Sequence, residues 1–272
     1  MKKVPAALRN ATKRDLPAIS LPANFAWAFA GNVVYGTGQW AILSLLAKIG
    51  GSQMLGQYAL ALAVTAPVVM LSHMNLRVVL ATDIEERHPF GDYLAVRLVT
   101  TAIALAAIAV LALVSGYSRS LAAAILVMGV AQSAETVSDI YHGALQRRER
   151  MDQIARSVMT RTAVSVAALG AALWATGSLL VAVVALALGR LAVLMAYDRP
   201  VGAAAECRSR SGWRPELSIL RTALPLGVVL MLVSLNTNLP RYAIERHLGT
   251  RELGAFAAVA SFITVGGTIV HA

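Results

Sequence analysis

Long uncharged apolar stretches, separated by short polar segments, are the feature that most limits the fold of this chain. One of them, Ala102–Val114, reads AIALAAIAVLALV. A helix crosses the hydrocarbon core with about 20 apolar residues, whereas a membrane β-strand shows about ten residues of alternating polarity. A helix also satisfies its own backbone hydrogen bonds in lipid. The pattern therefore predicts an all-α polytopic membrane protein.

About eight stretches have the length of a span. They cover roughly residues 24–47, 55–76, 94–115, 121–145, 157–176, 178–197, 219–240 and 255–272. Only 14% of the residues are charged, against about 25% in soluble domains. We expect a basic tail (1–23), a first six-helix bundle (24–198), a linker (199–218) and the incomplete start of a second bundle (219–272).

Basic residues give an expected orientation. Most of the 24 Lys and Arg residues lie in the N-terminal tail and in the even-numbered loops between spans. Such an excess is typical of the cytoplasmic side, so we predict a cytoplasmic N-terminus and linker. The net charge of +10 is then explained by anionic lipid headgroups as partners, and we predict no nucleic acid.

One short segment occurs twice. GSQMLGQY (51–58) and GTRELGAF (249–256) share Gly, Leu and Gly in the same positions, and each follows an odd-numbered span. The two copies therefore have the same predicted orientation, as in parallel-repeat transporters. Their glycines are expected to allow left-handed turns. We expect a piece of a longer transporter; the alternative is a natural eight-span protein that dimerises.

The fourth span carries Glu135, Asp139 and His142 on one helix stripe. Ionisable residues at membrane depth mark ion pathways or internal pairs. We favour a functional role for Glu135, as a site for a coupling ion (H⁺ or Na⁺). For Asp139 and His142 we favour structural pairing with Arg147 or a loop arginine.

Span one carries Asn32, Tyr35 and Gln39 on one face. Their amides and ring suit sugar recognition, and they equally suit hydrogen bonds between helices. Both interpretations stay open. Arg190 is an isolated charge in span six. It has the forked geometry that binds a pyrophosphate, but we favour pairing with Glu135 or Asp139, or snorkelling to headgroups.

Span seven ends in NTNLPR, which places Asn236, Asn238 and Arg241 near the predicted outer mouth. They suit a basic vestibule for an anionic cargo; salt bridges to Glu245 and Glu252 are the alternative.

In the second loop we favour an ion pair that locks the loop, either Arg77 with Asp83 or Asp92 with Arg97. The alternative is that His73 and Arg77 close a gate or bind headgroups. The sequence contains no Gly-rich phosphate loop, no HExxH and no G-x-S-x-G. We therefore expect no enzymatic activity, no metal and no organic cofactor.

Four segments carry a family resemblance: Leu55–Asp83, Phe90–Leu98, Ala134–Asp152 and Leu235–Phe256. The last two, AETVSDIYHGALQRRERMD and LNTNLPRYAIERHLGTRELGAF, are the most specific. With them the chain resembles bacterial O-antigen and capsule flippases of the multidrug/oligosaccharidyl-lipid/polysaccharide exporter superfamily.

The resemblance implies two helix bundles around a central cavity. It also implies movement of undecaprenyl-pyrophosphate-linked sugar repeat units to the outer leaflet, with polysaccharide assembly proteins as partners. The alternatives are a cation-coupled multidrug exporter of the same fold, a membrane glycosyltransferase or ligase, and a non-transporting fragment.

Overall fold

The computed structural model describes residues 20–83, 87–205 and 213–270, with side chains up to residue 260. Every regular element in these ranges is helical. The long helices are α2 (Leu21–Leu45), α3 (Gly51–His73), α5 (Phe90–Val114), α6 (Arg119–Arg147), α7 (Met151–Thr176), α8 (Leu179–Val193), α10 (Leu217–Leu248) and α11 (Thr250–Val270). The short elements are the π-helical turns η1 (Leu46–Gly50) and η2 (Leu194–Asp198) and the helices α4 (Leu76–Thr82) and α9 (Arg199–Ala205).

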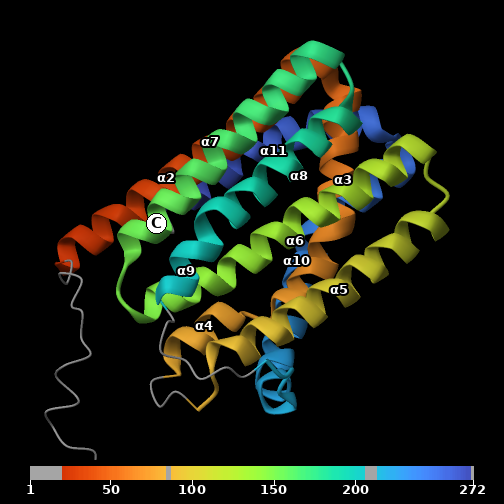
Figure 1. Ribbon diagram of the computed structural model, residues 1–272. Helices are drawn as coiled ribbons and strands as arrows, with labels where there is room; N and C mark the ends of the chain where they lie inside the picture. Colours follow the sequence, from red (N-terminus) through yellow and green to blue (C-terminus); the bar gives the residue numbers. More distant parts are fainter. Residues whose placement is uncertain (1–19, 84–86, 206–212, 271–272) are drawn as a thin grey trace, which may run out of the picture.

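Six helical stretches of the described chain are long and apolar enough to cross a membrane, which agrees with an all-α polytopic membrane protein. The first stretch, Leu21–Thr82, has 62 residues and would be about 90 Å long as one straight helix. A hydrocarbon core is about 30 Å thick. This stretch instead contains the separate helices α2 and α3 (Figure 1). The predicted count of about eight spans stays a prediction.

The predicted division into domains stays a prediction, and the helices at two of its boundaries have the following bounds. The linker predicted at 199–218 begins with the helix α9, and α10 starts at Leu217. The seventh span, predicted to end at residue 240, continues as α10 to Leu248 with Pro225 and Pro240 inside it. Residues 1–19 of the predicted tail and residues 206–212 of the linker lie outside the described residues.

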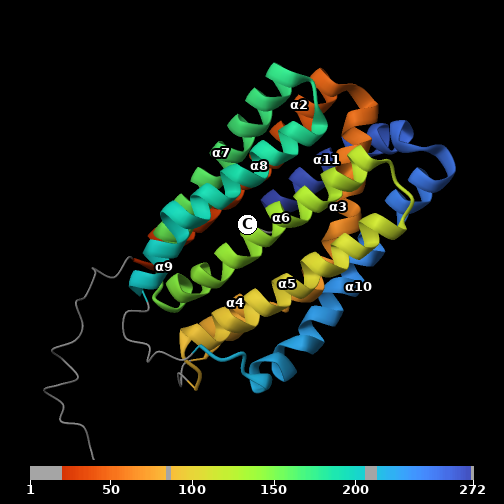
Figure 2. The same cartoon turned by 45° about the vertical axis from the view of Figure 1, so that its right-hand side comes forward.

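The helices α2 and α7 lie side by side and run in the same direction (Figures 1 and 2). Gly31 faces Ala155, and seven residues further along both helices Gly38 faces Thr162. A Cβ on Gly38 would collide with the Thr162 side chain. Small residues allow such close approach between helices in lipid, where packing rather than hydrophobicity holds helices together.

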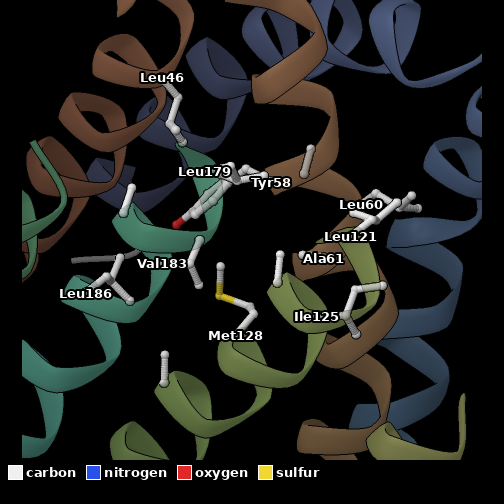
Figure 3. Packing of buried hydrophobic residues seen from close by; sticks show 14 of the residues in the cluster. Leu46, Tyr58, Leu60, Ala61, Leu121, Ile125, Met128, Leu179, Val183 and Leu186 are labelled. Carbon is white, nitrogen blue, oxygen red and sulfur yellow. The ribbon is translucent and has the colours of Figure 1, made fainter. Parts of the chain in front are cut away.

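One cluster of buried apolar side chains lies between α3, α6 and α8 (Figure 3). Met128 of α6 points between Val183 of α8 and Ala61 of α3, and all three side chains are fully buried. Tyr58 and Leu46 close this core next to η1. The core fixes α6 and α8 relative to each other, and both helices carry charged residues one to two turns below it.

The repeated segment has the same conformation in both copies. Gly51 has φ 72° and ψ −179°, and Gly249 has φ 91° and ψ 175°. Positive φ is the conformation that glycine adopts without strain, as expected for these turns. With ψ near 180° the two glycines are extended rather than left-handed helical. Each glycine ends one helix and opens the next, so the hairpins α2–α3 and α10–α11 turn in the same way.

The two copies also pack on each other. A Cβ on Gly56 would collide with the carbonyl oxygen of Thr250, and a Cβ on Gly254 would collide with that of Ser52. Gly56 and Gly254 are equivalent in the repeat, as are Ser52 and Thr250. The contact is therefore reciprocal, as expected about a two-fold axis. It also places both hairpin turns at the same end of the molecule.

Candidate functional site

A small pocket lies where α2, α6, α7 and α8 meet. Its lining consists of Tyr35, Gln39 and Ile42 from α2, Glu135 from α6, Arg161, Thr162 and Ser165 from α7, and Arg190 from α8. Tyr35 and Gln39 share a face because they are four residues apart, and the same spacing joins Arg161 to Ser165. The close contact between α2 and α7 at Gly38 and Thr162 brings these two faces together.

Glu135 is the centre of the charges in this pocket. Its Oε2 lies 2.8 Å from Nη1 of Arg190, and its Oε1 lies 3.6 Å from Nη2 of Arg161. The Nη1 group of Arg190 also donates to the carbonyl of Ala131 at 3.5 Å. Arg190 therefore pairs with Glu135, as the sequence interpretation favours.

The two arginines are more deeply buried than the carboxylate between them. The side chains of Arg161 and Arg190 are each 8% exposed, whereas the Glu135 side chain is 26% exposed. One carboxylate thus faces two guanidinium groups, and the pocket carries an excess of one positive charge. The empty space inside it holds about one water molecule, so in this conformation the pocket does not admit a sugar ring.

Arg161 is the residue of the pocket that sequence reasoning missed. It is not among the predicted site residues, although it lies inside the predicted fifth span, at 157–176. In the structure it is in the third turn of α7 and buried. A charge inside a predicted span is the signal that would have identified it, because such residues are costly in lipid.

Asp139 lies one helical turn from Glu135 but belongs to a different cluster. Its carboxylate contacts Nε2 of His73 at 3.0 Å and Nη1 of Arg77 at 3.2 Å. The Nε group of Arg77 donates to Oε1 of Gln146 at 2.8 Å. These contacts join α3, α4 and α6, so Asp139 forms a structural pair with Arg77 rather than lining the pocket.

His142 belongs to a third buried cluster. Its Nε2 lies 2.9 Å from Oγ of Ser157, and Ser157 donates to the carboxylate of Asp198. All three residues are at most 2% exposed. Asp198 is the last residue of η2, so this cluster fastens the end of that π-helical turn to α6 and α7. No pattern in the sequence indicated a role for Ser157 or Asp198.

The remaining predicted residues lie apart from the pocket. Asn32 is exposed on α2, and Asn236 is exposed on α10. Asn238 is buried, donates to the carbonyl of Ser234 at 2.8 Å and accepts from Arg241 at 3.0 Å. The structure therefore brings together Tyr35, Gln39, Glu135 and Arg190 but not Asn32, Asp139, Asn236, Asn238 or Arg241.

Both ion pairs predicted for the second loop are wrong. Arg97 is fully buried in α5 and donates to the carbonyl of Ser72 at 3.0 Å. Asp92 accepts from the backbone N–H of Arg214 at 3.0 Å. Asp83 accepts from the Tyr93 hydroxyl at 3.1 Å. Arg97 already lies inside the predicted span at 94–115, and in the structure it is in the third turn of α5, which begins at Phe90, rather than in the loop.

Among the residues that the structure describes, no group of three His, Cys, Asp or Glu side chains is arranged to hold a metal ion. The arrangement of the pocket instead favours binding through hydrogen-bond donors and positive charge.

Comparison with known proteins gives one informative similarity. The chain is 22% identical, over 253 residues, to a protein of Staphylococcus aureus named capsular polysaccharide biosynthesis protein CapF. The match covers 91% of this chain and 62% of the relative, so the chain spans less than two thirds of that protein. No protein-family model matches the chain. No solved structure matches it either. The similarity and the membrane helices support a membrane protein with a role in polysaccharide biosynthesis.

Proposed function

We propose that this chain belongs to a transporter that moves lipid-linked oligosaccharides across the bacterial cytoplasmic membrane by alternating access. The cargo would be repeat units carried on undecaprenyl pyrophosphate, for O-antigen, capsule or exopolysaccharide. The observation that carries the proposal is the reciprocal contact of Gly56 with Thr250 and of Gly254 with Ser52. It relates two helical hairpins of like orientation, which is the layout of parallel-repeat transporters.

The arrangement of α10 supports the same layout. Gly227 of α10 packs against Leu71 of α3, and Tyr242, further along α10, donates to the carbonyl of Ala63. The contact residues rise in number along α10 while their partners on α3 fall in number, so α10 runs antiparallel to α3. Helix α2 is likewise antiparallel to α3, its partner in the first hairpin. In the proposal α10 and α11 open a second bundle, and the two bundles enclose the passage for the polar headgroup.

The chemistry of the cargo fits the charges inside the helices. A pyrophosphate is recognised by guanidinium groups, and the pocket presents Arg161 and Arg190. In the proposal the narrow pocket lies inside the first bundle in a closed state, and it would have to widen within that bundle before a pyrophosphate could enter. A gradient of H⁺ or Na⁺ as the driving force remains part of the proposal. We do not assign the coupling ion to this pocket, because Glu135 already faces two arginines.

The proposal is tested in a bacterial strain from which the gene for this protein has been deleted. The proposal predicts that undecaprenyl-pyrophosphate-linked oligosaccharides accumulate on the cytoplasmic face, while the polysaccharide disappears from the cell surface. The full-length gene restores both. Lipid extracts from inside-out vesicles treated with a glycosidase locate the oligosaccharides.

Normal surface polysaccharide together with increased drug sensitivity in that strain would contradict the proposal and favour the multidrug exporter. Unchanged lipid-linked oligosaccharides would contradict it as well.

A further inference from the structure

We propose that the pocket between α2, α6, α7 and α8 binds a small anion through a single acceptor atom, either a halide ion or one oxygen of a phosphoryl group. This inference concerns the resident ligand of the pocket and does not depend on the cargo or on transport. It stands on three observations: the balance of charge, the unsatisfied donors and the size of the space.

The balance of charge favours an anion. Glu135 neutralises only one of the two guanidinium groups that lie next to it. The nearest other carboxylate on α6, that of Asp139, is paired with His73 and Arg77. An uncompensated buried charge costs several kcal/mol. Bound H⁺ or Na⁺ would raise this cost, and a bound anion would remove it.

The unsatisfied donors belong to residues that line the pocket. Nη1 of Arg161, Nε of Arg190 and Oγ of Ser165 are each buried without a hydrogen-bond partner. These three residues are 3% to 6% exposed. Buried donors in native structures have partners, so three unsatisfied donors around one space indicate a missing acceptor. Tyr35, Gln39 and Thr162 contribute further donors to the same lining.

The size of the space selects the kind of acceptor. It holds about one water-sized sphere. A water molecule fits but has no charge, so it would leave the excess positive charge in place. A chloride ion, or one phosphoryl oxygen, satisfies both the donors and the charge. Hydrogen bonds from charged groups to such an acceptor are the strong ones.

The experiment measures anion-dependent stability of the purified full chain in detergent. The midpoint of thermal unfolding is followed while chloride replaces gluconate at constant ionic strength, and in a second series while inorganic phosphate replaces gluconate. A saturable rise with at least one anion is expected. A rise with chloride identifies a halide site, and a rise with phosphate alone identifies a site for a phosphoryl oxygen.

Three variants connect the effect to the pocket. Arg161→Gln leaves Glu135 and Arg190 as a balanced pair, so the saturable rise should disappear. Ser165→Ala removes one donor and should raise the anion concentration at half-effect about tenfold, as expected for one hydrogen bond to a charged group. Arg156→Gln, an exposed position of the same helix, makes the same charge change away from the pocket and should keep the wild-type response.

No saturable rise with either anion would overturn the proposal and would mean that water alone fills the pocket. A rise of equal size in Arg161→Gln would overturn it too, because the anion would then act elsewhere on the protein.

Discussion

Glu135 shows how one carboxylate can hold three helices together inside a membrane protein. It lies on α6 and contacts Arg161 of α7 and Arg190 of α8. The pair with Arg190 was predictable, because an isolated charge in an apolar stretch needs a partner. The contribution of Arg161 was not predicted, although this charge lies inside the predicted fifth span. The precise partners of Asp139 and His142 depended on the packing of α4 and η2, which no local pattern in the sequence specifies.

The charge of Glu135 should therefore be needed for stability. Glu135→Gln leaves two buried guanidinium groups without a counter-charge, and breaking a buried pair in this way costs about 3–5 kcal/mol. We expect a clear drop in the midpoint of thermal unfolding in detergent. Glu149→Gln makes the same chemical change at an exposed residue of the α6–α7 turn and should leave the midpoint unchanged. Equal midpoints for the two variants would mean that the ion pairs of Glu135 contribute nothing.

At the scale of elements, the long helices follow from the apolar stretches, but their ends do not. Helix α10 passes through Pro240 to Leu248, because the turn that follows the proline is held on α3 by the hydrogen bond of Tyr242 to Ala63. Such a long-range contact cannot be inferred from the sequence, in which a proline indicates the end or a kink of a helix. Helix α3 ends at His73 with Met74 and Asn75 in left-handed conformation, although the predicted span continues to residue 76.

The crossing of α3 and α11 depends on the absence of a side chain at Gly56. Gly56→Ala should force the helices apart and destabilise the protein by about 1–3 kcal/mol, the usual cost of overpacking. In a helix without such a contact the same change stabilises by about 1 kcal/mol. Gly170→Ala of α7 is the matched control, because its Cβ would meet only the flexible end of Leu45 at 3.2 Å.

Thermal unfolding of both purified variants measures the difference. Gly56→Ala should unfold at a lower temperature than Gly170→Ala. The reverse order would show that the close contact between the two repeat copies does not form.

At the scale of the whole molecule, the structure describes a first set of helices from α2 to α9 and a hairpin, α10–α11, placed against α3 and α2. Large apolar side chains remain exposed along α5 and α10, among them Leu113, Val114, Val229 and Leu232. An apolar surface of this extent is expected for helices in contact with lipid or with further helices. The repeat was predictable from eight residues of sequence, whereas the contact between its copies required the structure.

The orientation of the two repeat copies is the claim on which the account depends, and accessibility of single cysteines tests it directly. In a variant without the one natural cysteine, Cys207→Ser, cysteines replace the exposed residues Gln53, Arg251 or Arg148. A membrane-impermeant maleimide applied to intact cells should label Gln53→Cys and Arg251→Cys, which lie in the two copies. It should label Arg148→Cys, in the α6–α7 turn, only after the membrane is opened. Labelling of residues 53 and 251 from opposite sides of the membrane would contradict the account.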